Sequence, residues 1–413
     1  MPRAAGNSRL KSARLAAGYP TQQAFAEALG VDVRQVRRWE SQKPPWPHPD
    51  MQQRLTDLTG QDVKALGFTP PTGRDHPHGQ RRLQPLPLRS WGSHRPVVPS
   101  QSPVPMQPAS VAVDFESITR SHRRMYWSLA PAALHAGIVA HAELGCSLLT
   151  ETAGRTRRTV AAALAETWLL AGRIEFFDLD LKEPEEAGAT LLRALQAAGE
   201  ADDALLGAAI LAHAAFIPGW AGNREASAER MVAARTYARR GPASAEFLAW
   251  LDAVEAECET RCGNARTALH LINHAEDTLK AGSEHPTPAW MDWFSPVRLA
   301  AFKGNTQLKA GHLPQARTTL LSVLEKLPAS EDKQRTVVYG DLAAVEAAAG
   351  QPEEACRYAC LALDQLETTW YATGMDRVRE VRRALAAHQH EQCVRDLDDR
   401  LYGWTTTVSA LAR

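Results

Sequence analysis

A short segment near the N-terminus concentrates side chains that can read nucleic acid. In a helix over residues 33–39, Val36 and Trp39 lie three positions apart and face inward. The outer faces then carry Val33, Arg34, Gln35, Arg37 and Arg38. Arg can bond guanine and Gln can bond adenine in the major groove, and each such contact discriminates by roughly 1 to 3 kcal/mol. The chemistry that this segment predicts is hydrogen bonding to base edges of double-stranded DNA.

The residues before this segment indicate how it is positioned. Thr21 is a suitable N-cap for a first helix that ends near Leu29, and Asp32 is a suitable N-cap for the second. Gly30 permits the left-handed backbone that a short turn requires. The spacing predicts a helix-turn-helix. Gln22, at the start of the first helix, is expected at the DNA backbone, where its amide and the free N–H groups of the helix hold a phosphate.

Flanking apolar residues extend this unit to a small bundle. Leu10, Ala13 and Leu15 recur before a glycine, and the segment over 49–68 is expected to form two further short helices. Five helices within residues 1–68 resemble the lambda-repressor-like, or XRE-family, DNA-binding domain. The alternative is a helical bundle that kept this fold without binding DNA.

Charge and proline content separate this N-terminal part from the rest. The first 113 residues carry 15 basic and 7 acidic side chains, and the remaining 300 carry 32 and 40. Residues 69–113 contain ten prolines and five arginines without helical periodicity. Such a composition predicts a disordered, extended linker between a basic N-terminal domain and an acidic C-terminal one.

From residue 114 to 413 the sequence repeats a helical pattern. Small residues follow turn positions at 187, 227, 268, 316 and 355, with separations of 40, 41, 48 and 39 residues. The residues at these anchor positions are Ala187, Ser227, Ala268, Ala316 and Ala355. Small residues at such positions let paired helices pack closely, and each pair leaves an apolar face for its neighbour. We therefore predict an all-α chain whose C-terminal domain is an α-solenoid of helical hairpins.

The copy over residues 297–328 resembles the tetratricopeptide repeat (TPR), and the others are longer, so the domain is described as TPR-like. The concave wall of such a superhelix binds extended peptides or partner proteins. Helical phase from the anchors places Trp250, Glu257, Arg298 and Asn305 on this wall. Asn can pair with a ligand's backbone, and Arg can clamp a carboxylate through two hydrogen bonds.

The segment PAWMDWF, residues 288–294, lies in the longest gap between anchors. Its aromatic side chains either close over a ligand or fill the space between hairpins, and large aromatic residues are more often packing residues.

The sequence gives little reason to expect catalysis or a metal site. Two cysteine pairs, at 258 and 262 and at 356 and 360, share helix faces, but both fall at packing positions and are expected in the core. No phosphate-binding glycine loop, nucleophile elbow or metalloprotease motif is found. We therefore expect no enzyme, no cofactor and no metal.

No membrane association is expected either. Residues 204–222 are uncharged but Ala-rich and interrupted by Pro218 and Gly219, so a buried helix is predicted. Six cysteines do not make a disulfide framework, and the N-terminus lacks the apolar core of a secretory signal. The expected location is the cytoplasm, at the nucleoid.

The three parts together resemble XRE-type bacterial regulators with C-terminal tetratricopeptide-like repeats, a group that includes peptide-sensing quorum regulators. The resemblance implies a sequence-specific transcriptional regulator that binds a palindromic operator as a homodimer and senses a peptide or protein effector. The alternative function is a TPR protein-interaction scaffold whose helix-turn-helix is vestigial.

Overall fold

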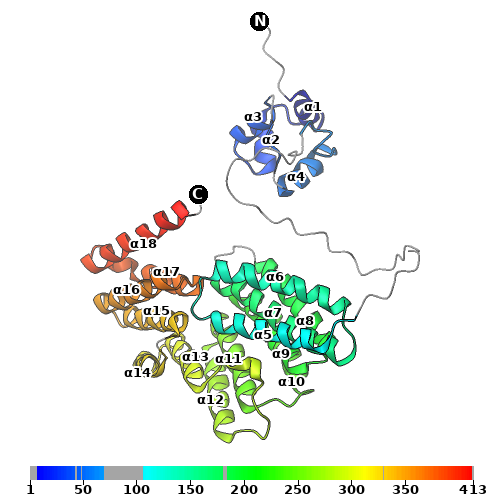
Figure 1. Ribbon diagram of the computed structural model, residues 1–413. Helices are drawn as coiled ribbons and strands as arrows, with labels where there is room; N and C mark the ends of the chain where they lie inside the picture. Colours follow the sequence, from blue (N-terminus) through cyan, green and yellow to red (C-terminus); the bar gives the residue numbers. More distant parts are fainter. Residues whose placement is uncertain are drawn as a thin grey trace. The chain divides into compact units, whose positions relative to one another are not determined.

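The computed structural model describes residues 7–41, 44–47, 49–68, 106–179, 184–328 and 330–411. These residues form α-helices joined by turns and short loops, and no strand occurs among them. The predicted all-α class is therefore confirmed. Contacts divide the chain into two compact units, one N-terminal and one C-terminal (Figure 1). We call the described residues 7–68 the head and 106–411 the body.

The segment predicted as a linker, residues 69–113, lies outside the described residues as far as 105. Its last part differs from the prediction, because helix α5 (Ala109–Met125) begins inside it. Pro108 is the residue that precedes this helix. The helical part of the body therefore begins five residues earlier than the expected boundary at 114.

The head contains the helices α1 (Ser8–Ala16), α2 (Gln22–Leu29), α3 (Val33–Trp39) and α4 (Pro49–Thr59). The predicted caps are confirmed. The hydroxyl of Thr21 accepts a hydrogen bond from the Ala24 amide at 3.1 Å, and the Asp32 carboxylate accepts one from the Arg34 amide at 2.7 Å. Gly30 ends α2 with φ at +71°, the left-handed conformation that the turn into α3 requires.

The head differs from the expected bundle in its last element. The fifth predicted helix is a short run of turns over residues 63–67 rather than a helix. Asp62 caps this run by accepting from the amide of Lys64 at 2.6 Å, and Gly67, at φ +85°, ends it. Too few residues remain between cap and glycine for a helix, but Val63, Leu66 and Phe68 still enter the core of the head.

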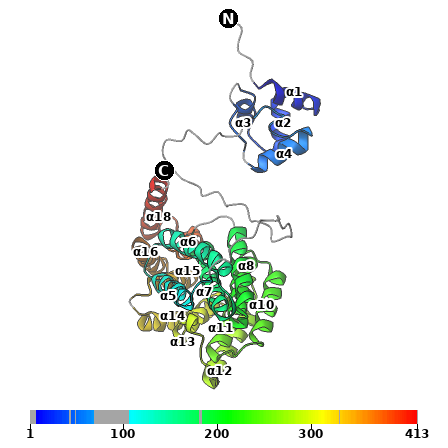
Figure 2. The same cartoon turned by 45° about the vertical axis from the view of Figure 1, so that its right-hand side comes forward.

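The body is built from successive pairs of helices, which follow one another in chain order in Figures 1 and 2. The five pairs are α7 (Gly154–Arg173) with α8 (Pro184–Ala201), α9 (Ala204–Trp220) with α10 (Arg224–Ala238), α11 (Ala245–Arg261) with α12 (Ala265–Ala281), α13 (Pro296–Lys309) with α14 (Leu313–Lys326), and α15 (Asp332–Ala348) with α16 (Pro352–Thr368). Helices α5 and α6 (Pro131–Thr150) precede them, and α17 (Ala372–Ala384) and α18 (Gln392–Leu411) follow them.

Each predicted anchor residue lies on the second helix of one pair and is buried. The exposed fraction is 3% for Ser227, 1% for Ala187 and 0% for the three remaining alanines. Gly304 of α13 shows how close the approach is, since a Cβ there would lie 2.5 Å from a methyl carbon of Leu320 on α14. Small residues at these positions allow the tight pairing that the sequence pattern predicted.

Two apolar helices are relevant to the expectation that the chain contains no membrane-spanning segment. Residues 204–220 form α9, most of whose residues are buried in the body, as predicted. Helix α6 is long and apolar enough to cross a membrane by length and composition alone, with a mean hydropathy of 1.3. His141 on α6 is buried and lies 3.0 Å from the hydroxyl of Thr119 on α5. Of the most apolar 18-residue stretch of α6, 33% is buried in the body.

The body curves so that segments far apart in sequence meet. Helix α7 continues into a π-helical turn, η1 (Ile174–Asp178), which contacts α17. The hydroxyl of Thr373 donates to the carbonyl oxygen of Phe177 at 2.9 Å, and the ammonium of Lys333 on α15 donates to Asp178 at 2.8 Å. These contacts link the first helical pair with the last one.

Candidate functional site

The outer face of α3 carries the side chains that the sequence analysis assigned to DNA. Arg34, Arg37 and Arg38 are exposed, while Val36 and Trp39 are buried at 0% and 1% exposure. Gln35 is half-buried. Val33 is also half-buried and packs against the head core, so it presents less of its side chain than the prediction assumed.

Gln22 has a contact that the sequence analysis did not foresee. Its amide nitrogen donates to Glu40 Oε2 at 2.6 Å, while Arg14 Nε donates to Glu40 Oε1 at 2.7 Å. Glu40 and Arg14 are both almost fully buried. The side chain of Gln22 therefore ties α2 to the end of α3, and its amide N–H groups are not all available for a phosphate.

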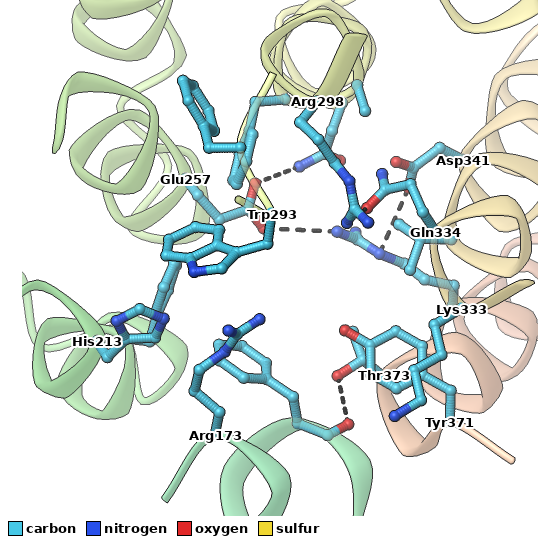
Figure 3. A pocket seen from close by; sticks show the side chains of 18 of the residues that line it. Arg173, His213, Glu257, Trp293, Arg298, Lys333, Gln334, Asp341, Tyr371 and Thr373 are labelled. Atoms are coloured by element: carbon cyan, nitrogen blue, oxygen red, sulfur yellow. Dashed lines mark hydrogen bonds and ion pairs between the residues drawn. The ribbon is translucent and has the colours of Figure 1, made fainter. Parts of the chain in front are cut away.

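The body contains a cavity of about 160 Å³ between η1, the first helices of the last four pairs and the start of α17. Figure 3 shows its side chains converging from these elements on a central opening. Four basic residues line it, namely Arg173, Arg298, Lys333 and Arg377. Ten aromatic residues other than histidine also line it, namely Tyr126, Trp127, Phe177, Phe216, Trp220, Trp250, Trp293, Phe294, Phe302 and Tyr371.

The four residues that the sequence analysis placed on the inner wall all line this one cavity. They are Trp250, Glu257, Arg298 and Asn305. They come from α11 and α13, which pack against each other. The structure thus brings the four together, and their role in effector binding stays a prediction.

Glu257 is the centre of a buried polar network. Its Oε2 accepts from the amide of Asn305 at 2.6 Å, and its Oε1 accepts from Arg261 at 3.2 Å and Arg377 at 3.4 Å. Burial disfavours the charged carboxylate, but the two guanidinium groups outweigh it, so the pKa of Glu257 lies below its usual value. Asn305 keeps one buried acceptor, Oδ1, without a partner.

Arg298 already has partners, which changes the role expected for it. Its guanidinium pairs with Glu331 at 2.7 Å, donates to the side-chain oxygen of Gln334 at 2.7 Å and stacks over the Trp127 ring at 4.0 Å. Burial lowers the pKa of Arg298, and Glu331 opposes this shift. A ligand carboxylate clamped by Arg298 would have to compete with Glu331, so Arg298 is not the free clamp that the sequence suggested.

The aromatic segment over 288–294 contributes to the cavity wall and to the packing between helices. Trp293 and Phe294 line the cavity. Trp290 packs edge-to-face on Phe247 with ring centroids 6.1 Å apart, and so fills the space beside the hairpin. Trp293 also meets Trp250 at 5.1 Å in an edge-to-face pair. The segment is therefore both a wall of the cavity and part of the packing.

His213 of α9 lies in the cavity wall as a neutral side chain. Its Nδ1 is 2.8 Å from the carbonyl oxygen of Ala209, and its ring lies 5.1 Å from that of Trp250. Burial, and after it the positive charge of Arg173, lowers the pKa of His213 to about 3. Since an unfolded histidine titrates near its ordinary value, His213 stabilises the fold above that value and loses this contribution as the pH falls toward 3.

This shift predicts a pH dependence of stability. Between pH 7 and pH 5 the wild-type body should lose about 2 kcal/mol of unfolding free energy through His213, because the unfolded chain takes up a proton that the folded chain rejects. Urea unfolding followed by circular dichroism measures this. A His213→Gln variant should show a correspondingly smaller loss, and His270→Gln, at an exposed position, should keep the wild-type response. Equal losses in all three proteins would contradict the assignment.

One cysteine of each pair lies in the core as expected, whereas Cys262 and Cys360 are only half-buried. Cys258 and Cys356 are buried, and burial raises the pKa of each thiol to about 12, so both stay protonated. Within the described ranges no three His, Cys, Asp or Glu side chains are grouped so that they could hold a metal ion.

Sequence reasoning missed most of the residues that line the cavity. Arg173 and Phe177 come from the end of α7 and from η1, before the first recognised repeat, and Lys333 and Tyr371 come from the start of the last pair and the loop before α17. A π-helical turn leaves no periodic signal, although such turns are frequent at functional sites. The contact between segments about 155 residues apart also leaves no local signal.

Comparison with models of known protein families finds no match, and no curated protein matches the chain. The site is therefore assessed from its own geometry.

Proposed function

We propose that the chain is a DNA-binding transcriptional regulator whose helical-repeat body controls it by binding an effector. The observation that carries this proposal is the face of α3. Arg34, Arg37 and Arg38 are exposed there, and the buried pair of Val36 and Trp39 fixes which way they point. Exposed donors on the second helix of a helix-turn-helix are what major-groove binding requires.

The body supports the second half of the proposal. Its pairs of helices carry small anchor residues at the spacing of TPR-like repeats, and its inner side encloses an aromatic, basic cavity. Concave sites lined by aromatic side chains with a few polar groups are typical of ligand binding. We propose that the effector occupies this cavity, in a cytoplasmic protein that binds a palindromic operator as a homodimer.

Selection of DNA from a random pool by the full-length protein tests DNA binding. The wild type should enrich one palindromic sequence. Arg34→Ala and Arg38→Ala should each weaken binding to it by about 1 to 3 kcal/mol, and binding should fall steeply with salt. Lys64→Ala, which removes an exposed charge outside α3, is the matched control and should keep the selected sequence.

Binding without sequence preference, or binding that the Arg34→Ala and Arg38→Ala variants retain, would contradict the proposal. It would favour instead the protein-interaction scaffold with a vestigial helix-turn-helix.

A further inference from the structure

One of the four arginine and lysine side chains that line the cavity of the body makes no ion pair within the described residues. Its other three basic residues are each paired with a carboxylate, Arg298 with Glu331, Lys333 with Asp178, and Arg377 with Glu257 and Asp341. Arg173 makes no ion pair and no hydrogen bond with any residue in the described part of the chain. Among the described residues Arg173 is therefore the one lining arginine or lysine that no carboxylate contacts.

Arg173 is held in place by two aromatic rings. Its guanidinium carbon lies 4.9 Å from the ring centre of Tyr126 and 4.9 Å from that of Trp293. Its Nε is buried and has no hydrogen-bond partner. Figure 3 shows the guanidinium below Trp293 at the edge of the central opening, and no dashed line reaches it. The fork of N–H donors is therefore oriented and unoccupied.

The neighbouring carboxylate Asp178 does not satisfy Arg173. Its Oδ2 accepts from Lys333 at 2.8 Å, and its Oδ1 accepts from the hydroxyl of Tyr126 at 3.1 Å. The charge of Arg173 also acts on His213, because after burial it is the next cause that lowers the pKa of His213. An anion entering the cavity meets in Arg173 a guanidinium that can pair with it through two hydrogen bonds.

The remaining walls define the other part of such a ligand. Trp250, Trp293 and Phe294 form one wall, and Trp250 and Trp293 meet edge-to-face at 81°. Phe177 and Phe216 form an edge-to-face pair on another wall. Flat apolar groups pack well against such rings. The volume of about 160 Å³ is more than ten times the roughly 10 to 15 Å³ that one water needs by a similar measure.

We propose that the cavity binds an organic anion that has a single carboxylate on a flat apolar body. Arg173 pairs with the carboxylate, and the aromatic walls enclose the body. A single negative charge matches the one cation that lacks an ion pair, whereas the second charge of a phosphate would find no further unpaired arginine or lysine among the lining residues that the structure describes. This inference rests on the proposed function, because it names the chemistry of the effector.

The same chemistry has two sources, a free aromatic acid and the C-terminal residue of a short peptide. The probes are 1-naphthylacetate for the first source and N-acetyl-glycyl-phenylalanine for the second. Each is compared with its neutral carboxamide, which has the same shape without the charge. Isothermal titration calorimetry with the full-length chain measures the four affinities.

At least one carboxylate should bind the wild type at least tenfold more tightly than its amide, about 1.4 kcal/mol. Arg173→Met should remove this preference, while Arg158→Met, which removes an exposed charge of the same helix, should keep it. Arg173→Met should also raise the melting temperature of the ligand-free protein, because it removes a half-buried cation that has no ion pair. A merely structural Arg173 would give the opposite shift.

Preference for naphthylacetate identifies a small acid as the source, and preference for the dipeptide identifies a peptide terminus. Equal affinity for acid and amide, no binding of either carboxylate, or an Arg173→Met variant that keeps the preference would overturn the proposal. The comparison of acid with amide uses the wild type, so it holds even where the variant does not fold. DNA selection is a separate measurement, and its failure would overturn the proposed function without changing these affinities.

Discussion

Replacing Lys333 by Met should destabilise the body by about 3 to 5 kcal/mol, because it leaves the carboxylate of Asp178 buried without its countercharge. The side chains of Lys333 and Asp178 are exposed by only 2% and 0%. The Lys333 ammonium also lies 3.7 Å from the ring centre of Tyr126. Only the Tyr126 hydroxyl would remain as a donor to Asp178. Urea unfolding of the full-length chain, followed by circular dichroism, measures the loss.

The pH dependence distinguishes an uncompensated charge from a simple packing defect. Burial raises the pKa of Asp178 even in the wild type, and burial lowers the pKa of Lys333 despite its carboxylate partner. Without Lys333 the folded-state pKa of Asp178 should rise further. A raised carboxyl pKa costs stability above the unfolded value and costs nothing below it. The deficit of Lys333→Met should therefore be smaller at pH 4 than at pH 7.

Two control variants complete this prediction. Lys280→Met breaks an exposed ion pair with Asp277 and should change the stability by less than about 1 kcal/mol. The double variant Asp178→Leu with Lys333→Met removes both buried charges and should recover most of the loss, since an apolar pair can replace a buried ion pair. A double variant as unstable as Lys333→Met would show that the loss comes from packing.

The ion pair of Lys333 and Asp178 constrains the geometry of the body more than it stabilises the folded state. Burial raises the pKa of Asp178 and lowers that of Lys333, so both groups are costly to bury in their charged forms. The contact joins η1 to α15 and lies beside the bond from Thr373 to the carbonyl of Phe177. A pair with such directional requirements specifies how η1 and α15 meet in the body.

The helical hairpins of the body could be predicted from the sequence because the packing requirement of each hairpin is local. Two helices that cross closely need a small residue at the contact, and Ala268, Ala316 and Ala355 are fully buried at that contact. The head was readable for the same reason, since Thr21, Gly30 and Asp32 each act within a few residues of their own position. The prediction of a fifth helix in the head was wrong, because Gly67 ends that segment after one turn.

Only part of the candidate site could be predicted from the sequence. Trp250, Glu257, Arg298 and Asn305 followed from the phase of recognised repeats. The partners of Arg298 did not follow, because Glu331 and Gln334 belong to the next pair, and a repeat pattern does not show which charges two neighbours share. Arg173 could not be recognised as unpaired before all nearby carboxylates were placed.

Replacing Glu40 by Ala should unfold the head, with a loss of about 3 to 5 kcal/mol, because it leaves Arg14 buried and unpaired. The side chains of Arg14 and Glu40 are exposed by only 4% and 7%. Arg14 would keep only its bond to the carbonyl oxygen of Tyr19 at 2.6 Å, and Gln22 would lose its acceptor. A domain of this size has little stability in reserve, so the loss should abolish its folding.

Amide hydrogen exchange of the full-length chain measures this effect in the head alone. In Glu40→Ala the protection of α1, α2 and α3 should disappear, while the helices of the body keep theirs. Glu27→Ala removes an exposed carboxylate of α2 that accepts from Gln23 at 2.9 Å, and it should leave the protection unchanged.

The Glu40 variant also separates folding from recognition. Arg34→Ala and Arg38→Ala should lose DNA affinity with a protected head, because both side chains are exposed and make no buried contact. Glu40→Ala should lose DNA affinity together with protection. If Glu40→Ala kept a protected head and lost only DNA binding, the buried pair would not be what holds α3 against α1, and Glu40 would have to act at the DNA itself.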